Sequence, residues 1–138
     1  GVQEAVMGFF KRLFGICATK PPADDGCWSV EHGNVVLELS RTPELKKPGS
    51  AVRLEGENLA RRVLVLHGED GKYYAFENKC SHAGRRIDPL KDESGLECCS
   101  VGKTTFDYTG KAIKGSSDKP IAQFETEHSD GKLIIALP

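Results

Sequence analysis

Sulfur and imidazole side chains gather between residues 78 and 110. This segment holds three of the five cysteines and one of the four histidines: Cys80, His82, Cys98 and Cys99. Thiolate and neutral imidazole are ligands for zinc or an iron–sulfur cluster, whereas magnesium and calcium prefer oxygen. One residue separates Cys80 from His82, and residues 83–97 separate His82 from Cys98. The spacing therefore predicts two short loops that close on one metal centre.

The flanks of these loops carry a wider pattern. Gly84 follows the first pair, and Phe106-Asp107 and Thr109-Gly110 follow the second. The segment resembles the cluster-binding region of Rieske-type [2Fe–2S] proteins, in which C-x-H on one loop and C-x-x-H-G on another hold two irons. Residues 115–120 are similar to the proline-containing loop that covers the cluster in that family. The resemblance extends from about residue 35 to the C-terminus.

The second loop departs from the family pattern. Cys98 and Gly102 match it, but Val101 stands where the second histidine belongs, and valine cannot ligate a metal. The resemblance implies that Cys80 and Cys98 hold the inner iron and that His82 holds the outer one. Three substitutes for the fourth ligand lie close by: Cys99, Ser100 and Lys103.

Cys99 is the best donor among these substitutes because thiolate is the normal ligand of cluster iron. A set of three cysteines and one histidine would lower the reduction potential relative to the two-cysteine, two-histidine set. Adjacent residues of an extended chain point to opposite sides, so Cys98 and Cys99 would need a kinked backbone to face one cluster.

Length and composition indicate one ordinary domain. The chain has 138 residues, with 38% hydrophobic and 28% charged residues and a net charge of −1. Such a balance does not favour nucleic acid, and no apolar run approaches the ~18 residues of a membrane span. An odd number of cysteines crowded in one segment favours metal binding in a reducing compartment over secreted disulfides. We therefore expect a cytoplasmic protein.

The first 26 residues form a predicted appendage to a β domain at residues 27–138. Apolar side chains at residues 6–14 recur at helical spacing. The helix could rest on a membrane surface or a partner subunit through residues 6–16, or it could cap the protein's own sheet. Pro21-Pro22 and the following aspartates indicate a linker. Cys17 and Cys27 flank the linker and are expected to be free thiols, while pairing or a second metal remains an alternative. Trp28 is expected to anchor the arm by packing.

Short strands and turns follow from residue 35 onward. The composition predicts strands at residues 35–39 and 51–54 and a hairpin of 62–67 with 72–77. It also predicts a second hairpin that starts with residues 104–108 and turns around Asp107 and Gly110, and a third of 121–126 with 133–137. Many short strands with glycine and aspartate turns predict an all-β sandwich or small barrel. The Rieske resemblance implies the same architecture, with a smaller cluster-binding subdomain at one end.

The resemblance implies a small carrier of single electrons between redox partner proteins, such as a reductase and an oxygenase-type acceptor. The chain has no room for a substrate domain and is not expected to be an enzyme by itself. Two alternatives stay open. Val101 also suits a Rieske fold that has lost its cluster and acts in protein interaction or regulation. A mononuclear zinc site made by Cys80, His82, Cys98 and Cys99 is the other.

Overall fold

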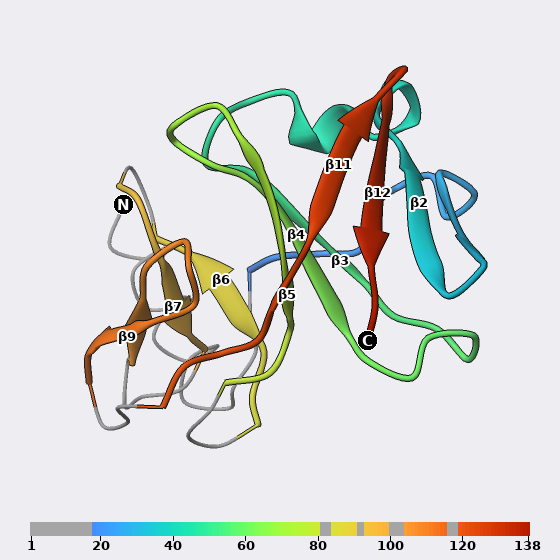
Figure 1. Ribbon diagram of the computed structural model, residues 1–138. Helices are drawn as coiled ribbons and strands as arrows, with labels where there is room; N and C mark the ends of the chain where they lie inside the picture. The colour runs from blue at the N-terminus through green and yellow to red at the C-terminus, as the bar shows by residue number, and fades with distance from the viewer. Residues whose placement is uncertain (1–17, 81–83, 91–92, 100–103, 116–118) are drawn as a thin grey trace.

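Strands dominate the protein. The structure, a computed structural model, describes residues 18–80, 84–90, 93–99, 104–115 and 119–138. Within these ranges the strands form three antiparallel sheets of four strands each. Figure 1 shows the sheet of β3, β4 and β5 between the other two. The all-β prediction is confirmed.

The first sheet has the strand order β1-β2-β12-β11. Its strands are β1 (Trp28–Glu31), β2 (Asn34–Glu38), β11 (Thr126–Ser129) and β12 (Lys132–Ala136). The turn between β1 and β2 has φ of 52° at His32 and 81° at Gly33, and the turn between β11 and β12 repeats this at Asp130 and Gly131. Two consecutive residues with positive φ are typical of the tight turns that suit twisted hairpins.

The central sheet has the order β10-β5-β4-β3. Its strands are β3 (Ala51–Leu54), β4 (Val63–His67), β5 (Tyr73–Glu77) and β10 (Gln123–Phe124). Both faces of β4 are covered, which explains its unbroken apolar run. Val63 and Val65 pack in the core shared with the first sheet, whereas Leu64 and Leu66 pack in a second core.

The third sheet, with the order β6-β7-β8-β9, lies at one side of the molecule (Figure 1). Its strands are β6 (Ile87–Pro89), β7 (Leu96–Cys98), β8 (Thr105–Phe106) and β9 (Ala112–Lys114). Ile87, Leu96 and Phe106 fill the second core against Leu64 and Leu66 of β4. The predicted metal-loop segment is therefore a small sheet in its own right.

Two short 3-10 helices, η1 (Leu39–Arg41) and η2 (Pro43–Leu45), connect β2 to β3. The described part of the N-terminal arm runs along the domain. The amide of Arg53 donates to the carbonyl of Lys20 (3.1 Å), and the amide of Ala23 donates to Glu44 Oε2 (2.7 Å). No helix within the described ranges has the length and apolar character to cross a membrane.

The hairpins predicted from composition are largely present. Residues 63–67 and 73–77 pair as expected. The prediction of one strand over residues 121–126 is wrong: β10 pairs with β5, and β11 pairs with β12 in another sheet. The helix predicted over residues 6–16 lies outside the described residues. Trp28 packs against the first core as predicted, and Cys27 is a reduced thiol buried in that core. Burial raises the pKa of the Cys27 thiol.

Candidate metal centre

The first loop begins where β5 ends, and hydrogen bonds of Asn78 hold it in place. The backbone amide of Asn78 donates to the carbonyl of Arg62 (2.8 Å), and Asn78 Oδ1 accepts from the amide of Ile87 (2.8 Å) at the start of β6. Asn78 is fully buried, and its Nδ2 has no hydrogen-bond partner in the described structure. The side chain therefore ties the two ends of the first loop together.

The loop closes tightly on itself. The amide of Cys80 donates to the carbonyl of Arg85 (2.6 Å), and the amide of Gly84 donates to the carbonyl of Cys80 (2.9 Å). Gly84 has φ of 68°, a conformation that costs a residue with a side chain more than it costs glycine. Arg62 Nη2 also donates to the Gly84 carbonyl (2.7 Å).

The second loop leaves β7 at Cys98. The amide of Cys98 donates to the carbonyl of Thr104 (2.8 Å), which closes this loop at its base. The amide of Cys99 donates to the carbonyl of Arg86 (3.0 Å). Because Cys80 bonds to Arg85 and Cys99 bonds to Arg86, the two loops meet at neighbouring residues.

Cys80 and Cys98 lie in one buried environment. Both are reduced thiols, with 1% and 0% of their surface exposed. Both belong to the second core, among Ile87, Leu96 and Phe106. The structure thus brings a cysteine from each loop into the same apolar cluster, while the metal centre itself stays a prediction.

Cys99 is in a different chemical state. It is buried, and it is disulfide-bonded in the structure. A disulfide sulfur is not a thiolate, so Cys99 offers no metal ligand in this state. The other predicted ligand and substitute positions (His82, Ser100, Val101 and Lys103) lie outside the described residues. Within the described ranges, no three His, Cys, Asp or Glu side chains gather as a metal ion would require.

The described residues fit the thiolate side of an iron–sulfur cluster. Two reduced, buried thiols, one from each loop, lie among the apolar side chains of the second core, which exclude water. The buried Nδ2 of Asn78, two residues before Cys80, is a hydrogen-bond donor still lacking an acceptor. Hydrogen bonds to sulfur are among the features that tune such clusters.

The Phe106-to-Gly110 flank is a turn that supports the second loop. Asp107 Oδ1 accepts from the amide of Thr109 (2.9 Å), the hydroxyl of Thr109 (2.5 Å) and the amide of Lys111 (3.1 Å). The bond from Thr109 is the main cause that lowers the pKa of the Asp107 carboxyl. Gly110 has φ of 91°, and its carbonyl accepts from the amide of Ile121 (2.9 Å). The side chain of Ile121 belongs to the second core, as does that of Cys98.

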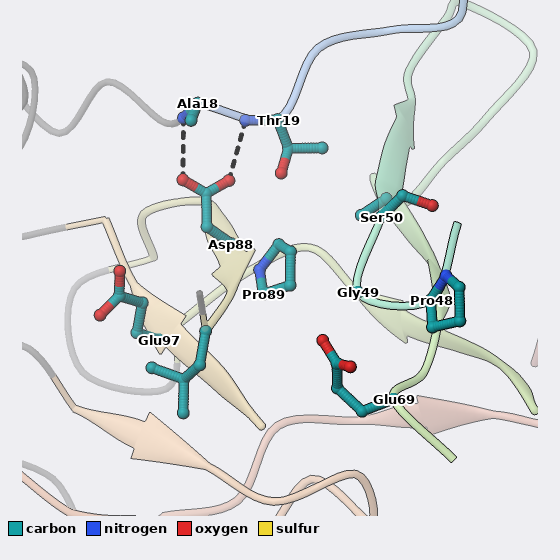
Figure 2. A pocket seen from close by; sticks show the side chains of 11 residues that line it. Ala18, Thr19, Pro48, Gly49, Ser50, Glu69, Asp88, Pro89 and Glu97 are labelled. Carbon is teal, nitrogen blue, oxygen red and sulfur yellow. Dashed lines mark hydrogen bonds between the residues drawn. The ribbon is translucent and has the colours of Figure 1, made fainter. Parts of the chain in front are cut away.

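The N-terminal arm docks on the small sheet. Figure 2 shows the Asp88 carboxylate of β6 accepting from the amides of Ala18 (2.8 Å) and Thr19 (2.9 Å). A cavity of about 550 Å³ lies beside this contact, with the carboxylates of Glu69 and Glu97 among its lining groups. Asp88 pairs with Glu97 across the β6–β7 ladder, one position from Ile87 and Cys98. The arm therefore reaches the sheet that carries the second loop.

Sequence reasoning did not identify Asn78, Arg62 or Asp88 as residues that position the loops. The signal for Asn78 was its place two residues before Cys80, where a buried amide can bridge a loop. Arg62 and Asp88 carry no local signal, because their partners lie 22 and at least 69 residues away in the chain.

A protein-family model for the Rieske [2Fe–2S] domain matches residues 35–125. The 3-phenylpropionate/cinnamic acid dioxygenase ferredoxin subunit of Shigella flexneri is 26% identical over 92 residues, covering 65% of this chain and 83% of that protein. The solved ferredoxin of carbazole 1,9a-dioxygenase from Nocardioides aromaticivorans superimposes with a TM-score of 0.59 at 26% identity, covering 73% of this chain and 93% of that one. A solved complex of reduced oxygenase and oxidised ferredoxin in carbazole 1,9a-dioxygenase gives the same TM-score at 22% identity, over 80% of this chain and 93% of that one.

Proposed function

The chain belongs to the Rieske [2Fe–2S] domain family, and from this membership we propose that it is a small carrier of single electrons between redox partner proteins. The observation that carries the proposal is the meeting of the two loops at Arg85 and Arg86, with Cys80 and Cys98 buried in one cluster. When bound, a [2Fe–2S] cluster supplies one-electron chemistry that no side chain here offers.

We further propose that Cys80 and Cys98 hold one iron, that His82 holds the other, and that Cys99 completes the set. Cys99 can do so only as a thiolate, so its disulfide must first be reduced. This requirement agrees with a reducing compartment, and the cytoplasm is our proposal for the location.

The chain's own residues would hold the loops and exclude water. The second core surrounds both thiols with apolar side chains, which limits the access of water through the interior of the domain. Asn78 and Arg62 fix the first loop at both ends, and the Asp107 turn fixes the second. Such preorganisation keeps ligand positions constant between redox states, as electron transfer requires.

The names of the relatives suggest the partners. Two of the proteins similar to this chain are the ferredoxin subunit of a dioxygenase and the ferredoxin of carbazole 1,9a-dioxygenase. We propose a reductase as the electron donor and an oxygenase-type protein as the acceptor, with no catalytic role for the chain alone. Residues 6–16 are proposed as an additional contact with a membrane surface or a neighbouring subunit.

Optical and electron paramagnetic resonance spectra test the proposal. Protein reduced with a phosphine and reconstituted anaerobically with iron and sulfide should be reddish brown, and dithionite should produce a paramagnetic signal. Cys80→Ala and Cys98→Ala should each abolish both features. Cys27→Ala is the matched control, because Cys27 is equally buried but lies in the other core. A colourless wild-type protein after this treatment would refute the proposal.

A second function is favoured by the state of the sulfurs. Cys99 is disulfide-bonded, and Cys80 and Cys98 pack among apolar side chains. Both features suit a Rieske domain that binds no cluster and acts in protein interaction or regulation. This function predicts that the cysteine variants bind no metal, like the wild type. Zinc without sulfide in the wild type would instead indicate a mononuclear site.

A further inference from the structure

Six cationic side chains surround the first loop. Lys79, Arg85 and Arg86 belong to the loop segment, Arg62 bonds to Gly84, and Arg53 and Arg61 connect to the loop through Glu55 and Glu77. Lys79 and Arg85 lie within the loop segment and are exposed, while Arg61 keeps 48% of its side chain exposed. We call these six residues the basic patch.

Two of the arginines bond to one carboxylate, and the charge of a third acts on it. Arg86 makes two bonds to Glu55, from Nε to Oε2 (3.0 Å) and from Nη2 to Oε1 (2.7 Å), and Arg53 Nη1 lies 3.2 Å from Oε2. The hydrogen bond from Arg86 is the largest cause that lowers the pKa of the Glu55 carboxyl, with smaller contributions from the charges of Arg86, Arg53 and Arg62. One carboxylate among three guanidinium groups leaves a local excess of positive charge.

Arg62 and Lys79 lie close to Gly84 of the loop, and Arg61 pairs with the carboxylate that precedes Asn78. Arg62 donates to the Gly84 carbonyl (2.7 Å). The Lys79 side chain passes close to Gly84, since a β-carbon added there would lie 3.7 Å from Lys79 Cε. Arg61 pairs with Glu77 at 2.5 Å. Cationic side chains, three of them exposed, therefore gather at the first loop.

We propose that the basic patch docks an acidic protein surface, namely a redox partner that presents clustered Asp and Glu side chains. Charge complementarity of this kind orients two proteins before contact and speeds association. The patch borders Cys80, so docking there would bring the partner close to the proposed cluster ligands. The inference deepens the proposed function, because it names the chemistry of the partner at the same loop.

The charge distribution favours a protein over a polyanion. Nucleic acid and anionic membranes attract chains with an overall positive charge, whereas this chain has a net charge of −1. Glu55 and Glu77 are interleaved with the cations. Interleaved charge matches discrete carboxylates on a protein better than a continuous row of phosphates. The bidentate Arg86–Glu55 pair is itself an example of the geometry that arginine offers a carboxylate.

Retention of the full-length protein on a carboxylate-terminated monolayer, measured by surface plasmon resonance, tests the proposal. Wild-type protein should bind at low ionic strength and dissociate as salt is added. The double variant Arg61→Glu/Lys79→Glu should lose about tenfold or more of this retention. The matched control is Lys46→Glu/Lys47→Glu, which changes the net charge equally. Both lysines are exposed and lie beside His67, at the opposite end of β4 from Arg62.

The control variant should keep retention within about twofold of wild type, since the proposal depends on position and not on net charge. Equal losses in both double variants, or wild-type retention that ignores salt, would overturn the proposal. Stronger retention on phosphatidylserine vesicles or duplex DNA than on the carboxylate monolayer would overturn the choice of a protein partner. Retention on the monolayer does not depend on iron. A protein that binds no cluster would therefore refute the proposed function, whereas the docking surface is decided by the retention of the two double variants.

Discussion

Replacing Asn78 with alanine should loosen the first loop. The variant removes the acceptor for the buried amide of Ile87, and an unsatisfied buried donor costs about 1–3 kcal/mol. Part of this cost is offset, because the wild-type Nδ2 is itself buried without a hydrogen-bond partner in the described structure. The lost packing of a fully buried side chain adds to the penalty. We expect a net loss of about 1–2 kcal/mol of unfolding free energy, or roughly 3–8 °C in Tm.

Urea denaturation would measure the free energy, and amide hydrogen exchange would locate the effect. Exchange at Ile87 should accelerate more than exchange in the strands of the first sheet, because the lost bond is local. Asn78→Asp keeps an acceptor oxygen and should preserve much of the protection at Ile87. Asn58→Ala, at an exposed position, is the control and should change stability by less than about 0.5 kcal/mol. Unchanged protection at Ile87 in Asn78→Ala would refute the assigned role.

Three further predictions concern the elements that hold the site. Gly110→Ala should cost about 2 kcal/mol or more, because its β-carbon would collide with the Ile121 carbonyl, whereas Gly71→Ala has a similar φ of 84° and open space and should cost less; equal losses in denaturation would contradict this. The bond to Asp70 raises the pKa of Tyr74 to about 12 from 10.0, so its stabilisation is present below pH 10 and is lost as pH rises toward 12. Tyr74→Phe should therefore show a shallower fall in unfolding free energy over this interval than wild type, and parallel curves would refute the assignment. Asp88→Ala should speed hydrogen exchange at the amides of Ala18 and Thr19, whereas Glu69→Ala, in the same cavity lining, should leave it unchanged.

Local patterns predicted most of the strands and the meeting of the two loops. The apolar run of β4 indicated a buried strand, but not that its two faces serve different cores. The segment at residues 121–126 was read as one strand, because nothing local shows that the chain changes sheets at Glu125. The spacing of Cys80 and Cys98 predicted two loops that close on one metal centre, and the structure places both cysteines in one buried cluster.

Contacts between distant parts of the chain could not be predicted. Asp88 holds the arm through residues about 70 positions away, and the bonds to Glu55 join the end of β3 to Arg86, which precedes β6. The disulfide state of Cys99 was also missed, because the crowded cysteines were interpreted only as metal ligands. Each of these features depends on tertiary geometry and leaves no periodic signal in the sequence.

The amount of iron, acid-labile sulfide and zinc per chain tests the account most directly. The measurement is made on wild-type protein whose Cys99 disulfide has been reduced before anaerobic reconstitution. The account predicts about two iron atoms and two sulfides per chain and no zinc, in line with a [2Fe–2S] cluster. Iron and sulfide near zero under these conditions would contradict it.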